Sequence, residues 1–379
     1  MDRRSFQQWS AVSLATAAST TAKAAQPGAE GGLFREMTSR PANYESPRSV
    51  LTQRLTPVDR FYARNHFDTP IVDVASWRLS IGGQVAKPLS LSLADLQAMP
   101  QTTVEAVLQC SGNGRALFQP RMPGVQWERG AVGNAEWTGV RLNDVLAKAG
   151  VAPSARYVQV QGAERPVLPK TPAFIRGIPL TKAMHGDTII ALHMNGQPLP
   201  RQHGAPARLV VPGWVADDWI KWLTTIELLD GEPKGFWYET AYRFPDAPGT
   251  PGAPVAPEHM KVMTAMNVKS VIGSIEPGAV LAPGPVEIVG VAWSGDGHAI
   301  TKVEVSVDGT TWQRATLDGA ASKYGFRVFR STWRAPPGPA VLRARATDDS
   351  GAAQPDAPVW NPSGYLWNAI DPVTVEVRS

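Results

Sequence analysis

The chain of 379 residues contains one cysteine, which stands directly before a flexible, charged stretch. Cys110 lies in LQCSGNGRALFQP, where two glycines and Arg115 follow it. A single cysteine is most often a small buried residue, and it cannot form an intramolecular disulfide. Here Gly112 and Gly114 permit close approach of a bulky ligand, and Arg115 favours the thiolate, a soft metal ligand. One protein sulfur is too few for a zinc or iron–sulfur site, so the pattern predicts a metal whose other ligands belong to a cofactor.

Three further stretches carry groups suited to anion binding. They are FYARNHF with Arg64, Asn65 and His66; NGQPLPRQHGAPARLVVPGW with His203 and Arg208, followed by Lys221 in WIKW; and GFWYETAYRFP with Tyr238 and Tyr242. Guanidinium, ammonium and imidazole groups on loops suit a phosphate or another oxyanion. A scattered set of solvated charges would have the same composition. No Walker or GxGxxG pattern accompanies these stretches, which argues against an ordinary nucleotide loop.

The elements that must position these residues change type along the chain. Short strands, helices and long loops precede residue 244. Ser92 is a predicted start signal for one helix, and Gly150 is a predicted stop signal for another. Alternating apolar strands with Asp-Gly turns follow residue 261. We therefore predict an α+β domain over 26–244 and an immunoglobulin-like β-sandwich over 261–379. Prolines at every third position predict that the linker 245–260 is a stiff, extended polyproline II strut.

Charge and hydropathy restrict the partners. The net charge of +4 comes from 37 basic and 33 acidic residues without a basic run, so nucleic acid is not a predicted partner. No stretch reaches the roughly 18 apolar residues of a membrane span. Arg3 and Arg4, then Phe6 and the small residues of Ala22-Lys23-Ala24, are typical of a twin-arginine signal peptide over residues 1–25. The mature chain is then expected in the periplasm.

Taken together, these stretches resemble the sulfite oxidase family of molybdopterin enzymes, and within it the bacterial periplasmic sulfite dehydrogenases. The resemblance runs from about residue 55 to the end through ARNHF, CSGNGR, EWTGVRLNDVLAKAG, MNGQPLPRQHGAPARLVVPG, WIKW, AWSGDG and VWNPSGYLWNAI, in the family's order. It implies a molybdopterin-binding catalytic domain followed by an immunoglobulin-like dimerisation domain. A single cysteine excludes a C-x-x-C-H haem attachment site.

The resemblance also assigns roles to single residues. Cys110 matches the molybdenum ligand, with one molybdenum–molybdopterin per chain. Arg64 and Arg115 match the arginines that hold the oxyanion, and Tyr242, in preference to Tyr238, matches the active-site tyrosine. His66 would lie near the anion or the cofactor, and Trp127 would line the pocket. The implied cofactor-binding set is Tyr62, Ala63, Arg64, Asn65, His66, Cys110, Glu164, His203, Arg208, Trp219, Ile220 and Lys221.

Two positions depart from the family pattern. Glu164 stands where aspartate is usual, and Ser363 stands where animal relatives carry a further arginine. The second change removes one positive charge from the substrate pocket and predicts weaker anion binding or a different substrate.

The implied function is molybdenum-dependent oxidation of sulfite to sulfate, with electrons passed to an external c-type cytochrome. The implied assembly is a homodimer, or a heterodimer with a cytochrome subunit. Within the same fold, the alternatives are the sulfur dehydrogenase of a thiosulfate-oxidising complex and a nitrate or sulfoxide reductase. An exported binding protein without catalytic activity is the alternative from a different class.

Overall fold

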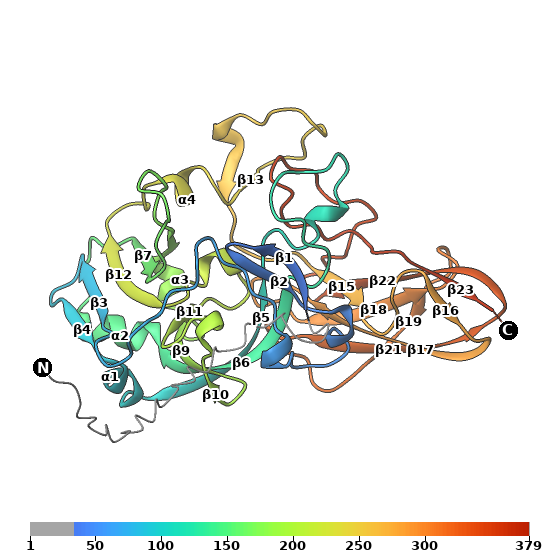
Figure 1. Ribbon diagram of the computed structural model, residues 1–379, viewed down its shortest axis with the longest axis horizontal. Helices are drawn as coiled ribbons and strands as arrows, with labels where there is room; N and C mark the ends of the chain where they lie inside the picture. Colours follow the sequence, from blue (N-terminus) through green and yellow to red (C-terminus); the bar gives the residue numbers. More distant parts are fainter. Residues whose placement is uncertain (1–33, 379) are drawn as a thin grey trace, which may run out of the picture.

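The computed structural model describes residues 34–378, so the predicted signal peptide lies outside the described residues. Strands predominate in both halves of the molecule, which lie side by side along its long axis (Figure 1). The fold confirms the expected α+β domain followed by an all-β domain. No helix within 34–378 is both long enough and apolar enough to cross a bilayer.

The N-terminal domain is built on two five-stranded sheets. One has the order β10-β9-β6-β5, with β11 also paired to β9, and the other has the order β4-β3-β12-β7-β8. A short ribbon of β1 and β2 precedes them. The strands are β1 (Arg35–Ser39), β2 (Ala42–Glu45), β3 (Leu79–Gly83), β4 (Leu89–Leu91), β5 (Gln101–Gln109), β6 (Val132–Arg141), β7 (Tyr157–Gly162), β8 (Ile175–Pro179), β9 (Ile189–Met194), β10 (Gln197–Pro198), β11 (Arg208–Val210) and β12 (Leu223–Leu229).

Helices in this domain are short and have defined ends. Ser92 caps α1 through a reciprocal capping box with Asp95, and α2 ends at Gly150, whose φ of 70° is left-handed. Both ends confirm the sequence signals. The α-helices are α1 (Leu93–Gln97), α2 (Leu142–Ala149), α3 (Leu180–Ala183) and α4 (Phe236–Glu239). Single 3-10 turns are η1 (Arg48–Val50), η2 (Val58–Arg60), η3 (Arg115–Leu117), η4 (Arg201–His203), η5 (Ala216–Asp218) and η6 (Pro257–His259).

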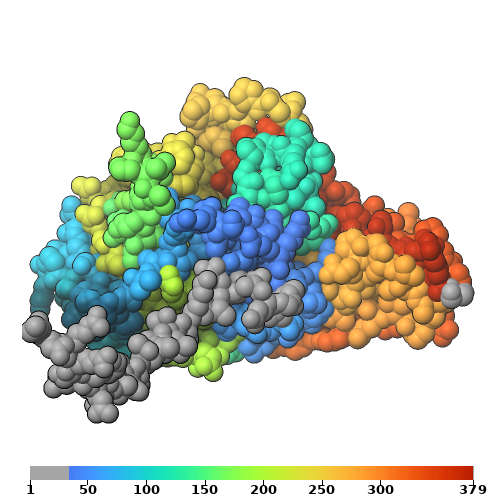
Figure 2. All heavy atoms as spheres, viewed as in Figure 1, coloured from blue at the N-terminus to red at the C-terminus, as the bar shows by residue number. Residues whose placement is uncertain are grey.

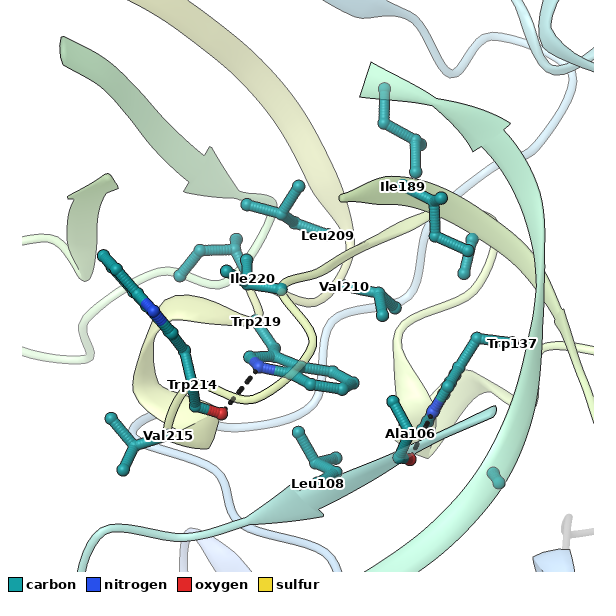
Figure 3. Packing of buried hydrophobic residues seen from close by; sticks show 14 of the residues in the cluster. Ala106, Leu108, Trp137, Ile189, Leu209, Val210, Trp214, Val215, Trp219 and Ile220 are labelled. Atoms are coloured by element: carbon teal, nitrogen blue, oxygen red, sulfur yellow. Dashed lines mark hydrogen bonds between the residues drawn. The ribbon is translucent and has the colours of Figure 1, made fainter. Parts of the chain in front are cut away.

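Buried tryptophans hold strands β5 and β6 against the segment that follows β11 (Figure 3). The indole N–H of Trp137 on β6 donates to Ala106 O on β5 at 3.0 Å, and that of Trp219 donates to Trp214 O at 3.1 Å. The two rings meet edge to face, with centroids 5.8 Å apart. Such a pair adds about 0.5–1.5 kcal/mol beyond the burial of its surface. The strand β5 and the loop after β11 are therefore held against one another.

The C-terminal domain is a β-sandwich, as predicted. Its two sheets have the orders β15-β17-β21-β20 and β16-β23-β22-β18-β19. Between them lies a separate apolar core that includes Ile288, Val303, Phe329 and Leu342. The strands are β15 (Lys269–Ile272), β16 (Ala279–Leu281), β17 (Gly284–Trp293), β18 (Ile300–Ser306), β19 (Gln313–Arg314), β20 (Thr316–Leu317), β21 (Arg327–Ala335), β22 (Gly338–Asp348) and β23 (Val373–Val377).

The proline-rich segment is not the extended strut that its spacing predicts. Strand β13 (Arg243–Pro245) pairs antiparallel with β14 (Met260–Val262), and Pro245 faces Met260. The segment therefore leaves and returns at the same place as a closed loop. Regular proline spacing favours local polyproline II geometry, but the backbone pairing at the two ends decides the path of the chain.

The last part of the chain returns to the N-terminal domain. Phe118 packs with Trp360, Trp367 and Ala369 in a small apolar cluster. Figure 2 shows the turquoise segment around 115–125 against red C-terminal atoms. The residues after β22 thus help to form the surroundings of the loop that carries Cys110.

Candidate active site

One cavity brings together most of the predicted site residues. It is lined by twelve of them: Tyr62, Ala63, Arg64, His66, Cys110, Glu164, His203, Arg208, Trp219, Ile220, Lys221 and Tyr242. Leu108, Ser111, Phe174, Gln202, Ala216 and Asp217 complete the lining. The cavity lies where several loops meet at the ends of strands: the loop after β5 brings Cys110, the loop before β3 brings Arg64, and the segment between β11 and β12 brings Lys221.

Cys110 is 8% exposed, and burial dominates its acidity. Burial raises the pKa of the Cys110 thiol, while the charges of Arg64 and Arg115 lower it by a smaller amount. The expectation that Arg115 favours the thiolate is right in direction, but burial outweighs that effect. The thiol of the metal-free chain is therefore protonated near neutral pH, and metal binding must release that proton.

Three predicted residues lie outside the cavity lining. Arg115 Nε donates to Ser363 O at 2.9 Å, and another guanidinium nitrogen donates to Val125 O at 3.0 Å. Trp127 is fully buried, with its ring edge-on to that of Tyr62. Asn65 donates to Ala42 O at 2.6 Å and accepts from Lys221 Nζ, so it supports the lining from behind. Arg115 acts on Cys110 through its charge rather than by facing the cavity.

His66 and Tyr242 form one part of the cavity wall together. His66 Nε2 and the Tyr242 hydroxyl are hydrogen-bonded, and the imidazole stacks on Phe174 with ring centroids 3.8 Å apart. Burial, with the charges of Arg64 and Lys221, lowers the pKa of His66 well below its usual value, so the ring is neutral. Burial raises the pKa of Tyr242 well above its usual value, so the phenol keeps its proton.

The backbone at Tyr242 is held in an uncommon conformation. Its φ is 56°, in the left-handed region that residues with a Cβ rarely adopt. Such a conformation costs on the order of 1 kcal/mol and persists only where the surroundings enforce it. The conformation directs the phenol into the cavity, whereas Tyr238 does not line it.

Buried polar atoms without a hydrogen-bond partner gather around this cavity. They are Arg208 Nε, Glu164 Oε2, Tyr62 Oη, Ser111 Oγ and both carboxylate oxygens of Asp217. Buried polar groups almost always have a hydrogen-bond partner, so such a concentration indicates a polar ligand. A cofactor with a metal for Cys110 and a phosphate for the cations fits the thiol and the cationic donors of this cavity.

Burial also dominates the acidity of the cations in this cavity, and the charge of Glu164 offsets only part of it at Lys221. Burial lowers the pKa of Arg208 to about 10 and that of Lys221 to about 7. The pKa of His203 falls to about 3, through burial and the neighbouring charges of Arg208 and Lys221. Within 34–378, the hydrogen bonds of Arg208 and Lys221 go to backbone or amide oxygens, and neither forms a salt bridge. A bound anion would relieve this repulsion.

Sequence reasoning missed an acidic cluster beside the cavity. Fully buried Arg176 donates to Asp218 Oδ1 at 3.0 Å, and its NH2 lies 3.6 Å from Asp217. The Arg176 guanidinium also lies 5.3 Å from the centroid of the Tyr242 ring. Burial raises the pKa of Asp218 to about 7. The adjacent aspartates just before WIKW were the available signal, because two consecutive carboxylates are uncommon in so apolar a segment.

The comparisons with known proteins agree with the predicted family and cofactor. Residues 66–237 match the family model described as the oxidoreductase molybdopterin binding domain, and residues 260–378 match the Mo-co oxidoreductase dimerisation domain. The chain is 36% identical to mitochondrial sulfite oxidase of Mus musculus, over 91% of this chain and 66% of that protein. It is 33% identical to sulfite oxidase of Arabidopsis thaliana, over 87% of this chain and 91% of that protein.

A solved structure shows the same architecture. The sulfane dehydrogenase SoxCD from Paracoccus pantotrophus superposes with a TM-score of 0.78 at 29% identity, over 90% of this chain and 88% of that one. The chain spans slightly less than two thirds of the length of the animal mitochondrial relatives. The matched domains confirm the predicted molybdenum–molybdopterin cofactor. This chain therefore belongs to the sulfite oxidase family of molybdopterin-dependent oxidoreductases.

Proposed function

We propose that this protein oxidises sulfite to sulfate and passes the electrons to a c-type cytochrome. The observation that carries the proposal is the meeting of the lone thiol of Cys110 with the basic side chains of Arg64, Arg208 and Lys221 in one cavity. The family relationship supports the same reaction class. In balanced form, sulfite and water give sulfate, two protons and two electrons.

Separate residues would hold the cofactor. Cys110 would bind molybdenum through its thiolate, and Arg208, His203 and Lys221 would hold the pterin and its phosphate. The cofactor supplies oxygen-atom transfer and two-electron redox chemistry. Arg208 Nε is well suited to this role because it is buried and has no other acceptor. A planar guanidinium can also make paired hydrogen bonds to a phosphate.

The substrate would lie on the side of Arg64, His66 and Tyr242. Arg64 contributes a cation to the cavity wall, and the protonated phenol of Tyr242 can donate a hydrogen bond to an oxyanion. The neutral His66 imidazole fixes the phenol through their hydrogen bond. Arg115 would add positive potential to the substrate side. Its hydrogen bond to Ser363 O shows that position 363, where animal relatives carry an arginine, lies next to Arg115.

The test is sulfite-dependent reduction of a c-type cytochrome by protein of known molybdenum content. Turnover with one molybdenum per chain supports the proposal. Molybdenum without sulfite turnover rejects sulfite as the substrate. Repeated absence of molybdenum in protein made in a molybdenum-replete host would favour a non-catalytic binding protein. His298→Ala is a suitable control, because His298 pairs with Asp349 at the surface of the C-terminal domain.

A second candidate is oxidation of a sulfane sulfur. The match to a sulfane dehydrogenase over 90% of this chain favours it, as does the lower positive charge that Ser363 implies. Parallel assays with sulfite and with a persulfide or thiosulfate donor separate the two candidates. A larger kcat/KM for the sulfane donor would replace sulfite in the proposal.

Association through residues 260–378 also belongs to the proposal, because this segment matches a dimerisation domain. The partner is a second copy of the chain or a cytochrome subunit. Multi-angle light scattering of the purified chain, alone and with a c-type cytochrome, distinguishes these assemblies. A monomer under both conditions would contradict them.

We further propose export to the periplasm, on the basis of Arg3, Arg4 and the small residues around Ala24. The double variant Arg3→Lys/Arg4→Lys should retain the protein in the cytoplasm. Cell fractionation and the mass of the exported N-terminus test this, with a mature start expected near Ala25. Export of the double variant at the normal level would contradict the proposed route.

A further inference from the structure

The loop that presents Cys110 is held from one side by the C-terminal half of the chain. Gln109 Oε1 accepts from the Trp293 indole at 2.7 Å, and Ser111 O accepts from the Leu366 N–H at 2.8 Å. Arg115 Nε donates to Ser363 O at 2.9 Å. Successive parts of the loop are therefore positioned by residues more than 150 positions away in sequence.

The centre of this contact surface is a buried lysine that the proposed chemistry does not use. Lys269, on β15, is 1% exposed, and its Nζ lies 3.4 Å from Asn113 O, a long hydrogen bond. Its ammonium lies 4.9 Å from the ring centroid of Trp367 and 5.9 Å from that of Trp293. Burial lowers the pKa of Lys269 to about 7, so the site tolerates the cation at a cost.

Both rings beside Lys269 also contact the thiol loop. Trp293 donates to Gln109, directly before Cys110. Trp367 packs on Gly114 so closely that a Cβ built there would lie 2.8 Å from Trp367 Cβ. An apolar side chain would fill the space at position 269 at a lower desolvation cost. The cation instead orients two aromatic rings and one carbonyl that together define the shape of the loop.

We propose that Lys269 is a positioning residue that fixes the Cys110–Arg115 loop, so that the C-terminal domain directly organises the metal-binding thiol. The inference rests on the proposed role of Cys110 as the metal ligand. Lys269 acts through Trp293, Trp367 and the Asn113 carbonyl, and it does not itself contact the cavity. The domain that matches a dimerisation module thus has a second task within its own chain.

The first test uses the single cysteine as a reporter in full-length, cofactor-free protein. The rate of Cys110 alkylation by iodoacetamide under native conditions measures opening of the loop. Lys269→Met should raise this rate about tenfold, because a desolvated cation–π contact is lost. Lys269→Arg keeps the charge and should stay close to the wild-type rate. Trp367→Leu removes one ring and should act in the same direction as Lys269→Met.

The control variant separates positioning from general loss of stability. Val303→Ala creates a cavity in the sandwich core, away from the loop, and should lower Tm while leaving the alkylation rate within about twofold of wild type. In protein from a molybdenum-replete host, Lys269→Met should reduce molybdenum per chain and lower kcat more than it raises KM. The Val303→Ala protein should keep wild-type values of both constants.

The outcomes have separate meanings. If Lys269→Met and Trp367→Leu alkylate like wild type, or if Val303→Ala is accelerated as much as they are, the positioning role is wrong. If both variants accelerate alkylation but even the wild-type chain takes up no molybdenum, the positioning role stands and the proposed function fails.

Discussion

Two groups of buried cations in this molecule differ in what lies opposite them. At the contact between the domains, Arg48 and Arg129 both donate to the buried carboxylate of Asp371, at 3.1 Å in the case of Arg48. In the cavity, Arg208 and Lys221 have backbone or amide oxygens as acceptors, and no salt bridge joins them to any residue of 34–378.

The pKa values follow this difference in part. Burial lowers the pKa of Arg48 in spite of Asp371. At Arg129, burial is offset by the hydrogen bond and charge of Asp371 and by two glutamates, so the pKa is raised, whereas burial lowers the pKa of Arg208 to about 10. A buried charge without a counter-ion costs stability, so its retention indicates a partner that the protein itself does not supply. The interface group stabilises the fold, and the cavity group is prepared for an anion.

The largest expected effect comes from replacing Cys110, which lines the same cavity as these cations. Cys110→Ser should lower sulfite turnover at least about a thousandfold, because the metal loses its one protein ligand. Its circular dichroism spectrum and Tm should stay close to wild type, since a single buried atom changes. Loss of the folded state would instead show that Cys110 has a structural role. The cavity would then no longer differ from the domain interface in its contribution to the fold.

The interface group gives the next largest effect. Asp371→Asn leaves two buried guanidinium groups without their shared carboxylate and should lower the free energy of unfolding by about 3–5 kcal/mol. Denaturant unfolding measures this change. A loss below about 1 kcal/mol would show that the ion pairs at the domain contact do not stabilise the fold.

Arg208→Met tests the cavity group, where removing a buried charge should cost little or no free energy of unfolding. Cofactor-free Arg208→Met should unfold within about 1 kcal/mol of wild type or at a higher free energy, because an uncompensated charge is replaced by a chain of similar length. The affinity of the same variant for the cofactor should be lower by roughly 10–100-fold. Destabilisation as large as that of Asp371→Asn would make Arg208 a structural residue and end the distinction.

The most gradual effect is the pH dependence of stability that comes from Lys221. Its pKa is about 7 in the folded chain and 10.5 in its ordinary state, so between these values the unfolded chain binds more protons. The free energy of unfolding of cofactor-free protein should therefore rise with pH from about 7 to 10.5, by at most about 1.4 kcal/mol per pH unit for this group. The Lys221→Met protein should lose the contribution of Lys221 to this slope. The contribution of Lys269, whose pKa burial also lowers to about 7, should remain. Equal slopes in the two proteins would contradict the assigned burial of Lys221.

Local signals translated well into local structure. The capping box at Ser92 and the glycine stop at Gly150 mark helix ends that the structure reproduces. The proline-rich segment failed as a strut because the pairing of β13 with β14 is a contact between residues about 15 positions apart. Periodicity within a segment carries no information on such pairing.

The sequence alone determined which residues have chemistry to offer and in which domain they lie. The lone cysteine, the cation-rich loops and the change from mixed to alternating apolar pattern are properties of neighbouring residues, and short-range preferences are enough to interpret them. Only the tertiary structure decided which side chains share a cavity and which carry unpaired charge. It turned Arg115 toward Ser363, placed Asp217 in the lining and brought Lys269 beneath the Cys110 loop. Burial and pairing depend on what the rest of the chain places around a group, and they set its pKa and its free partners.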